Sequence, residues 1–429
     1  MAEEPRLTKD YTNAPVPDEA TIHGLRVALV VAGIGATLPM FLLGSQISVG
    51  LGLRLAVPVC FAACALVGLL GTLTSIVGSR SRLSTYQVVT FAFGVRGARL
   101  VNLVLGVMLI GWFATTGEML GAAIQHAVAG IHGTAWPQWI YTVGSLTAMT
   151  LTGIFGFRVM ERFVRVTVPL LAALMAYVVW LSLLRGGLTA ALSRPGDDSL
   201  STVDALSSVI GAIILTAVLA PDLTRYARND RHALLSVLGL VVGFPTALIM
   251  AAIPATVFGE GDVMKVMTTL GIPGLAIVIL VMSTWTSNTS NLYSSTLTLA
   301  TFFKRSSGKQ LGCGAAFVAL VAALLGIADH FIPVLIVLGV ISAPLAGVYV
   351  VDFFGVNHQR YDQGTIDSLP AIRASAFAAW ILGSAAGLAG TYYRYSLTSI
   401  PAVDSILIAA FAYFIMSSGP LRRVASGKP

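Results

Sequence analysis

Residues 33–44 read Gly-Ile-Gly-Ala-Thr-Leu-Pro-Met-Phe-Leu-Leu-Gly and lie in the middle of the first long apolar run of the chain, 25–52. A run of this length is long enough to cross a bilayer as a helix. The stretch nevertheless carries proline and glycines near the depth of the bilayer centre, and these residues disfavour a continuous helix. We therefore expect the first membrane-spanning helix to be broken at this point.

The composition indicates a membrane protein. Of the 429 residues, 56% are hydrophobic and only 10% are charged, whereas soluble domains have about 25% charged residues. The net charge is +7, but the basic residues are scattered between apolar runs instead of being gathered on one face. This distribution argues against a nucleic-acid partner. We expect an all-α protein whose outer surface contacts membrane lipid.

Apolar runs of spanning length recur along the whole chain. They lie at 25–52, 54–78, 99–128, 138–157, 163–184, 204–221, 233–258, 273–301, 311–328, 331–353, 373–391 and 402–418. In lipid, only a helix satisfies its own backbone polar groups without closing into a barrel. The simplest interpretation is twelve transmembrane helices.

The basic residues predict the orientation, because Lys and Arg accumulate in the loops that stay in the cytoplasm. With the N-terminus inside, most of the 26 basic residues fall in inside segments. The outside segments then hold only Arg54, Arg185, Arg194, Lys265 and Arg394. We therefore expect a multi-pass protein of the cell (inner) membrane with both termini in the cytoplasm.

The sixth apolar run resembles the first, because its residues 211–222 also combine glycine and proline, ending at Pro221-Asp222. Breaks five helices apart suggest two five-helix halves of opposite topology around a binding site near the bilayer midplane, as in many secondary transporters. The alternative is that Gly and Pro are common in membrane helices generally. The predicted division is a cytoplasmic tail 1–23, a first repeat 24–184, a second repeat 185–354, an accessory helix pair 355–418 and a cytoplasmic tail 419–429.

The eighth run contains a dense polar cluster at residues 283–291, Ser-Thr-Trp-Thr-Ser-Asn-Thr-Ser-Asn. Helical spacing places the hydroxyls of Ser283, Thr286 and Ser287 on one face. Together with carbonyl groups released at the break of the first helix, such oxygens suit a small monovalent cation. The alternative is that these hydroxyls satisfy carbonyls of their own helix.

The third run contains two further features. Thr115 and Thr116 lie on the same helical face as Trp112, and an aromatic wall beside hydroxyls suits a planar heterocyclic ligand; a packing role for the tryptophan is the alternative. Glu118 is the one carboxylate deep in the middle of an apolar run, which makes it a functional candidate. It lies about 240° around the helix from Trp112, so we interpret it as a structural acid or a proton-coupling group.

At this point the chain resembles nucleobase–cation symporter family 1, most nearly the bacterial cytosine permeases. The resemblance spans nearly the whole chain and rests on the order and spacing of several short motifs. These are Pro15-Val-Pro17, Phe93-Gly-Val-Arg-Gly97, Gly111-Trp-Phe113, Asp222-Leu-Thr-Arg-Tyr226, Trp285-Thr-Ser-Asn288 and Pro344-Leu-Ala-Gly347 followed by Asp352 and Arg360-Tyr361.

This resemblance implies a five-plus-five inverted-repeat fold with broken helices one and six, like that of LeuT, and uptake of a heterocyclic base by alternating access. Sodium is the implied coupling ion, with protons as the alternative. The implied sodium ligands are Gly33, Ala36, Ser283, Thr286 and Ser287. The implied substrate-binding residues are Trp112, Thr116, Gly211, Ala212, Ile213, Thr216, Asn288 and Asn291.

The chain departs from the cytosine permeases at polar positions of the implied substrate site, where it has Leu109, Ala212, Ile213 and Leu215. The polar edges of cytosine would therefore be left unpaired, so another purine, pyrimidine or related heterocycle is equally compatible. The alternatives are a proton-coupled permease for an allantoin- or hydantoin-like compound, which would give Glu118 a role, and a channel. We expect no enzymatic activity, no bound cofactor and function as a monomer.

Overall fold

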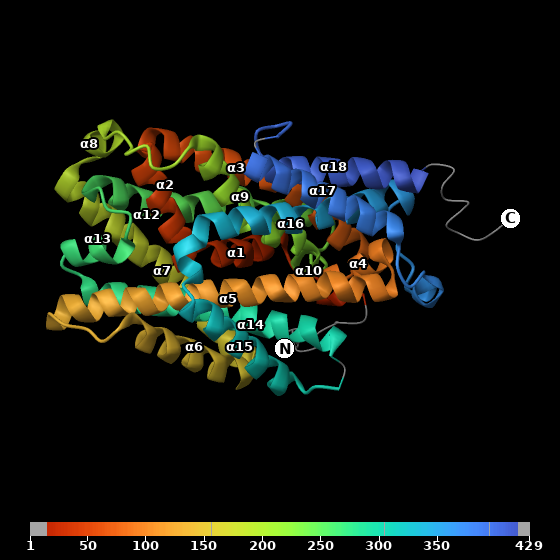
Figure 1. Ribbon diagram of the computed structural model, residues 1–429, viewed down its shortest axis with the longest axis horizontal. Coiled ribbons are helices and arrows are strands. Elements are labelled where there is room, and N and C mark those ends of the chain that lie inside the picture. The colour runs from red at the N-terminus through yellow and green to blue at the C-terminus, as the bar shows by residue number, and fades with distance from the viewer. Residues whose placement is uncertain (1–14, 156, 304, 394, 419–429) are drawn as a thin grey trace.

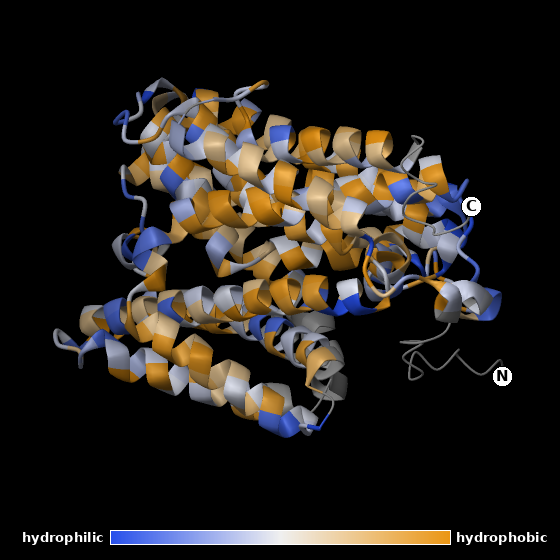
Figure 2. Ribbon diagram, turned by 45° about the vertical axis from the view of Figure 1, so that its right-hand side comes forward, coloured by the Kyte–Doolittle hydropathy of each residue, from blue (hydrophilic) through white to orange (hydrophobic). Residues whose placement is uncertain are grey.

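The computed structural model describes residues 15–155, 157–303, 305–393 and 395–418. Within these residues the chain is helical, and its only β pairing is an isolated bridge between Ile22 and Ala227. The long helices run roughly along one direction (Figure 1). Hydrophobic residues cover most of their length, whereas hydrophilic residues gather toward the two ends of the bundle (Figure 2). This is the distribution that a bilayer requires.

The helices of the first half are α1 (Gly24–Gly35), α2 (Leu38–Leu51), α3 (Leu53–Ser81), α4 (Thr85–Phe93), α5 (Val95–His132), α6 (Gln138–Phe155), α7 (Phe157–Gly186) and α8 (Leu188–Ser193), preceded by the 3-10 turn η1 (Asp18–Ala20). Those of the second half are α9 (Thr202–Val218), α10 (Ala220–Thr224), α11 (Asp230–Ser236), α12 (Phe244–Phe258), α13 (Val263–Thr269), α14 (Pro273–Phe302), α15 (Gly308–Leu324) and α16 (Phe331–Val351). The last pair is α17 (Ala374–Tyr393) and α18 (Pro401–Ser418). The remaining short segments are the π-helical η2 (Gly239–Gly243) and η4 (Asp352–Val356) and the 3-10 segments η3 (Ile327–His330) and η5 (Gln363–Ser368).

These elements form twelve consecutive spans, which confirms the predicted fold class. By length and composition alone, six of the described helices are apolar enough to cross a membrane, or seven if α1 and α2 count as one span. Helices α9, α15 and α18 are apolar but shorter. The polar cluster on α14 lowers the mean hydropathy of that helix, although it has 30 residues. Length, hydropathy and connectivity together are therefore needed to recognise all twelve spans.

The first span is broken where the sequence predicts it. Helices α1 and α2 meet at an angle of 66° across Ala36 and Thr37. Pro39 occupies the first turn of α2, where no intrahelical partner for its missing N–H is needed. The sixth span is also interrupted, but its break lies at Leu219, between α9 and α10. Residues 211–216 lie within the continuous helix α9.

The helices pack in two groups that follow the repeat. In one group, α2 packs on α12 and α3 packs on α9, so the first two spans meet the sixth and seventh. In the other, α5 packs on α6, α14 and α15, so the third and fourth spans meet the eighth and ninth. In the second group, helices five spans apart are neighbours, because α5 packs on α14 and α6 packs on α15. Helix α16 packs on α9 from the first group, and its preceding turn η3 contacts α5 from the second.

The far end of α16 is held by a buried carboxylate. Asp352 is fully buried at the start of η4 and accepts four hydrogen bonds. The donors are Arg373 at 2.9 Å, Tyr413 at 2.6 Å, Asn357 at 2.9 Å and Tyr361 at 2.7 Å. Burial and the charge of Asp352 raise the pKa of Tyr361 well above its ordinary value. This network joins α16 to α18, to the loop before α17 and to Arg373 at the edge of α17.

Candidate functional site

Helices α5 and α14 make the most extensive helix contact in the described structure and bring Trp112 close to the polar cluster of α14. Asn288 is fully buried, and its side-chain amide donates to the carbonyl oxygen of Phe113 at 3.0 Å and to the sulfur of Met149 at 3.4 Å. Because both contacts need a donor, the amide nitrogen must face Phe113 on α5 and Met149 on α6. The carboxamide oxygen of Asn288 is buried without a hydrogen-bond partner among the described residues, so it is available as an acceptor.

Trp112 is partly exposed, and its ring system and that of Phe331 form a T-shaped pair, with ring centroids 6.2 Å apart and planes at 83°. The neighbouring hydroxyls are committed to their own helix. Thr115 donates to the carbonyl of Gly111 at 3.0 Å, and Thr116 donates to that of Trp112 at 2.6 Å. In this arrangement both hydroxyls can only accept further hydrogen bonds. The predicted aromatic surface of Trp112 therefore lies close in the chain to two hydroxyl oxygens, those of Thr115 and Thr116, that can accept hydrogen bonds.

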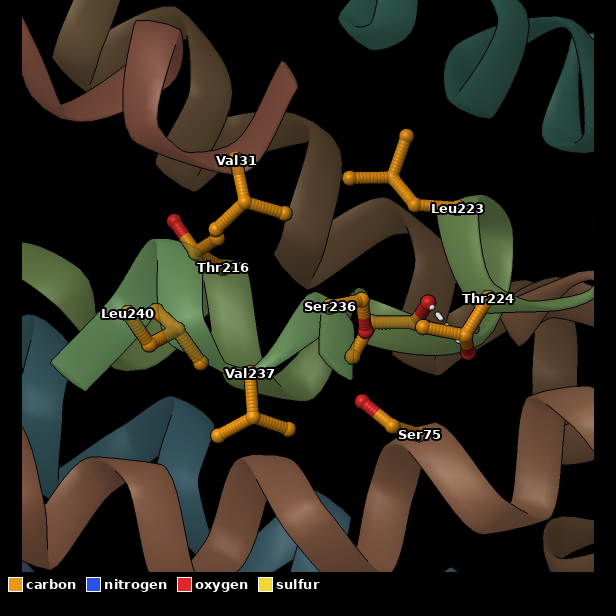
Figure 3. Close-up of a pocket in the computed structure, with 9 residues that line it drawn as sticks. Val31, Ser75, Thr216, Leu223, Thr224, Ser236, Val237 and Leu240 are labelled. Atoms are coloured by element: carbon orange, nitrogen blue, oxygen red, sulfur yellow. Dashed lines mark hydrogen bonds between the residues drawn. The ribbon is translucent and has the colours of Figure 1, made fainter. Parts of the chain in front are cut away.

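The predicted residues on α9 face different neighbours. A side chain at Gly211 would collide with the carbonyl oxygen of Leu335 on α16, so the two backbones touch there. Ala212 and Ile213 are buried. Thr216 is partly exposed and lies beside Val31 of α1 at a cavity of about 10 Å³ (Figure 3).

That cavity lies beside the interruption between α9 and α10, and its lining also includes Ser75 of α3 and Leu240 of η2. A second cavity of about 10 Å³ lies between α2, α7, α12 and α13. A volume of this size holds about one water molecule. Neither cavity holds a heterocycle as it stands, so binding in either would require helices to move apart.

The first turns of α16 lie between the two halves of the predicted substrate site. Phe331 contacts Trp112, and Leu335, one turn later, touches Gly211. Both side chains are buried. No sequence signal marks Phe331 or Leu335, because the run 331–353 is apolar throughout and contains no motif. They are recognised as part of this region only from their positions in the helix bundle, next to Trp112 and Gly211.

The predicted ion-binding residues come from neighbouring segments. Gly33 and Ala36 lie at the break of the first span, where the Ala36 N–H donates to the Gly33 carbonyl at 3.2 Å. Helix α2, which follows this break, contacts α14. Ser283 and Ser287 on α14 donate to carbonyls of their own helix, at 3.1 Å to Leu280 and at 3.2 Å to Ser283.

The side chain of Thr286, a predicted ion ligand, lies outside the described residues. Asn291, the last predicted substrate residue, is partly exposed on α14. Among the described residues, no group of three or more His, Cys, Asp or Glu side chains could hold a metal ion. The oxygens near the break and on α14 are neutral hydroxyls and carbonyls, and these fit a hard monovalent cation better than a transition metal.

Glu118 does not face Trp112. Its carboxylate accepts a hydrogen bond of 2.8 Å from the backbone N–H of Ala328 in η3, and the side chain is buried. It therefore connects α5 to the turn that leads into α16. Its place agrees with the prediction that it lies off the Trp112 face.

The family profile described as "Permease for cytosine/purines, uracil, thiamine, allantoin" matches residues 15–415. The chain belongs to this permease family. The cytosine permease of Escherichia coli K12 is 29% identical over 415 residues, covering 95% of this chain and 94% of the relative. The purine-uracil permease NCS1 of Arabidopsis thaliana is 22% identical over 468 residues, covering 99% and 74%.

Solved structures share the permease's fold. Mhp1, a nucleobase-cation-symport-1 family transporter, superimposes in a closed conformation with bromovinylhydantoin bound, at a TM-score of 0.81 and 18% identity, covering 98% of this chain and 97% of Mhp1. Its inward-facing conformation gives a TM-score of 0.83 at 17% identity, covering 99% and 96%. A Na⁺-coupled sialic acid symporter gives 0.66 at 14% identity, covering 92% and 90%.

Family membership makes the chain a multi-pass membrane transporter for nucleobases or related compounds, not an enzyme.

Proposed function

We propose that this permease imports a nucleobase or related heterocycle, such as cytosine or a purine, by cation-coupled alternating access, with Na⁺ as the coupling ion. The observation that carries the proposal is the partly exposed Trp112, deep in α5, next in the chain to Phe113, whose carbonyl binds the buried Asn288 with its unused acceptor oxygen. An aromatic surface stacks on a planar base, and the acceptor would pair with a ring N–H. Thr116, Asn291 and the α9 residues Gly211, Ala212, Ile213 and Thr216 complete the proposed site.

The proposed orientation follows the positive-inside rule, with both termini in the cytoplasm and the protein in the cell membrane. In the structure the first turn of α16 separates Trp112 from α9. Transport would then require this turn to move away whenever the substrate site opens between Trp112 and α9. We propose that one chain forms the complete pathway, because α5, α9, α14 and α16 all belong to it.

The proposed sodium ligands are the carbonyls of Gly33 and Ala36 with the hydroxyls of Ser283, Thr286 and Ser287. An ion held between the first and eighth spans would shape the substrate site between them. Such coupling is reciprocal, so sodium should tighten substrate binding by the same factor by which substrate tightens sodium binding. An unchanged substrate affinity when choline or potassium replaces sodium would remove sodium from the proposal.

A proton-coupled permease for an allantoin- or hydantoin-like compound is the second candidate, and the buried carboxylate of Glu118 favours it. Intramembrane carboxylates often carry transported protons. In that case Glu118→Gln should abolish the pH dependence of uptake. A channel is a third, weaker candidate, and counterflow of a labelled base in proteoliposomes distinguishes it from a carrier.

The experiment that tests the main proposal is a thermal-shift screen of nucleobases and hydantoins on the purified protein, with and without sodium. A ligand that binds the native state raises the melting temperature. Trp112→Ala should reduce the affinity for any hit by about tenfold. Trp139→Ala is the matched control, because Trp139 on α6 is 58% exposed. Equal losses in both variants would contradict the assignment of Trp112.

A further inference from the structure

The first turn of α16 blocks one approach to Trp112. Phe331 packs against the Trp112 ring, and the backbone carbonyl of Leu335, four residues later, touches the backbone of Gly211, so this end of α16 fills the space between α5 and α9. Only 4% of Phe331 and 1% of Leu335 is exposed. A ligand can reach Trp112 between these two helices only if this turn moves away.

A buried polar contact holds the same turn in place. The carboxylate of Glu118 accepts the N–H of Ala328 at 2.8 Å, three residues before Phe331. Ala328 belongs to η3, which continues directly into α16. A carboxylate at the start of a helical segment is favoured by the unpaired N–H groups and by the helix dipole. The Glu118–Ala328 bond therefore restrains the segment that leads directly into the first turn of α16.

The opposite end of α16 is held much more firmly. There Asp352 accepts hydrogen bonds from Arg373, Tyr413, Asn357 and Tyr361, which come from three separate parts of the chain. Between the two ends, Pro344 has no N–H to donate to the preceding turn of the helix. The helix is thus weakened around Pro344, about two-thirds of the way along it, where a bend would leave the Asp352 end fixed.

From this asymmetry we propose that Glu118 is a positioning residue, a latch that holds the first turn of α16 closed over Trp112. The bond between Glu118 and Ala328 is made when the first turn of α16 covers Trp112. It breaks when this part of α16 bends away at Pro344, while the Asp352 end stays in place. The inference rests on the proposed alternating access, but it assigns Glu118 a mechanical role that needs neither sodium nor proton transport.

The test measures how often the latch opens in the absence of substrate. Leu335→Cys places a reporter thiol under the closed turn, in a Cys313→Ser background because Cys313 is exposed, whereas Cys60 and Cys64 are buried. The rate of labelling by a membrane-impermeant maleimide is then measured in proteoliposomes. Glu118→Met, which removes the acceptor, should speed labelling by about three- to tenfold, and Glu118→Gln, which keeps an acceptor oxygen, by less.

A second variant removes the other partner of the bond. Ala328→Pro eliminates the donating N–H without changing α5. If the latch is this one bond, Ala328→Pro should speed labelling as Glu118→Met does, and the double variant should label no faster than either alone. Additive effects of the two substitutions would contradict the proposal.

Asp329→Asn is the matched control, because it neutralises an exposed carboxylate in the same turn. Because Asp329 is a like charge near Glu118, its removal should not loosen the Glu118–Ala328 bond, so the labelling rate should equal or fall below that of the parent. A rise equal to that of Glu118→Gln would overturn the latch. Melting temperatures of all variants show whether each is folded. If Glu118→Met and Ala328→Pro label no faster than the parent but the protein still takes up its base, the latch is wrong and the transport function stands. If no transported base is found, the labelling rates still test the latch by themselves.

Discussion

The side-chain amide of Asn288 donates to the backbone carbonyl oxygen of Phe113, 3.0 Å away, and so joins α14 to α5 next to Trp112. This contact gives Asn288 two tasks. Its nitrogen positions the helix that carries Trp112, and its oxygen stays free to accept. We expect Asn288→Leu to weaken substrate binding by about tenfold and to lower stability by about 1 kcal/mol.

Asn288→Asp is the informative contrast to this substitution. Aspartate keeps the acceptor but places a carboxylate oxygen against the Phe113 carbonyl, so it should destabilise the protein more than leucine does. Melting temperature and ligand titration of the two variants measure the two tasks separately. Greater stability of Asn288→Asp than of Asn288→Leu would contradict the positioning role.

The sodium proposal predicts a specific loss. Ser283→Ala combined with Ser287→Ala should abolish the stabilisation by sodium while leaving sodium-free stability nearly unchanged, because both hydroxyls currently satisfy carbonyls of α14. Thr296→Val is the control, since Thr296 makes the same kind of bond, to the Leu292 carbonyl at 2.8 Å, further along α14. Melting curves over a sodium titration provide the measurement.

The contact between Gly211 and Leu335 predicts that α9 tolerates no added methyl group at this point. Gly211→Ala should destabilise the protein by about 1–3 kcal/mol, because the new side chain meets the carbonyl of Leu335. Gly144→Ala on α6 is the control, since nothing lies within 4 Å of its added carbon. Helix propensity alone should make Gly144→Ala neutral or slightly stabilising. Denaturation of both variants checks the difference.

The buried Asp352 predicts a large effect far from the substrate site. Asp352→Asn removes the charge that compensates Arg373, whose side chain is only 23% exposed, and should cost about 3 kcal/mol. Asp362→Asn, in the exposed loop nearby, should change little. Equal melting temperatures for the two variants would show that the network does not anchor α16.

The same network predicts loss of stability at alkaline pH. Burial and the charge of Asp352 place the pKa of Tyr361 in the folded protein well above its unfolded value. The resulting stabilisation is fully present below the unfolded pKa of about 10 and is lost as the pH rises toward the folded pKa. Tyr361→Phe should therefore show a shallower loss of stability above that pH than the parent does, as measured by melting temperature against pH.

The position of the second break illustrates the limits of sequence reasoning. The sequence predicts that Gly211 belongs to a broken segment, yet it lies inside α9, and the interruption occurs at Leu219. A glycine in an apolar run has two possible causes: a break, or close approach of another backbone. The sequence does not distinguish them. In the structure the neighbour is the carbonyl of Leu335, so close approach is the cause here.

Residues near each other along the chain are enough to predict a twelve-span helical fold, a break within 33–44 and the polar cluster at 283–291, because transfer into lipid and helical periodicity depend on local sequence. The packing of the helices is what shows that Asn288 faces Phe113, that Glu118 meets Ala328 and that Phe331 contacts Trp112. These contacts join residues far apart in the sequence, and apolar helices carry little information about which neighbour they will pack against.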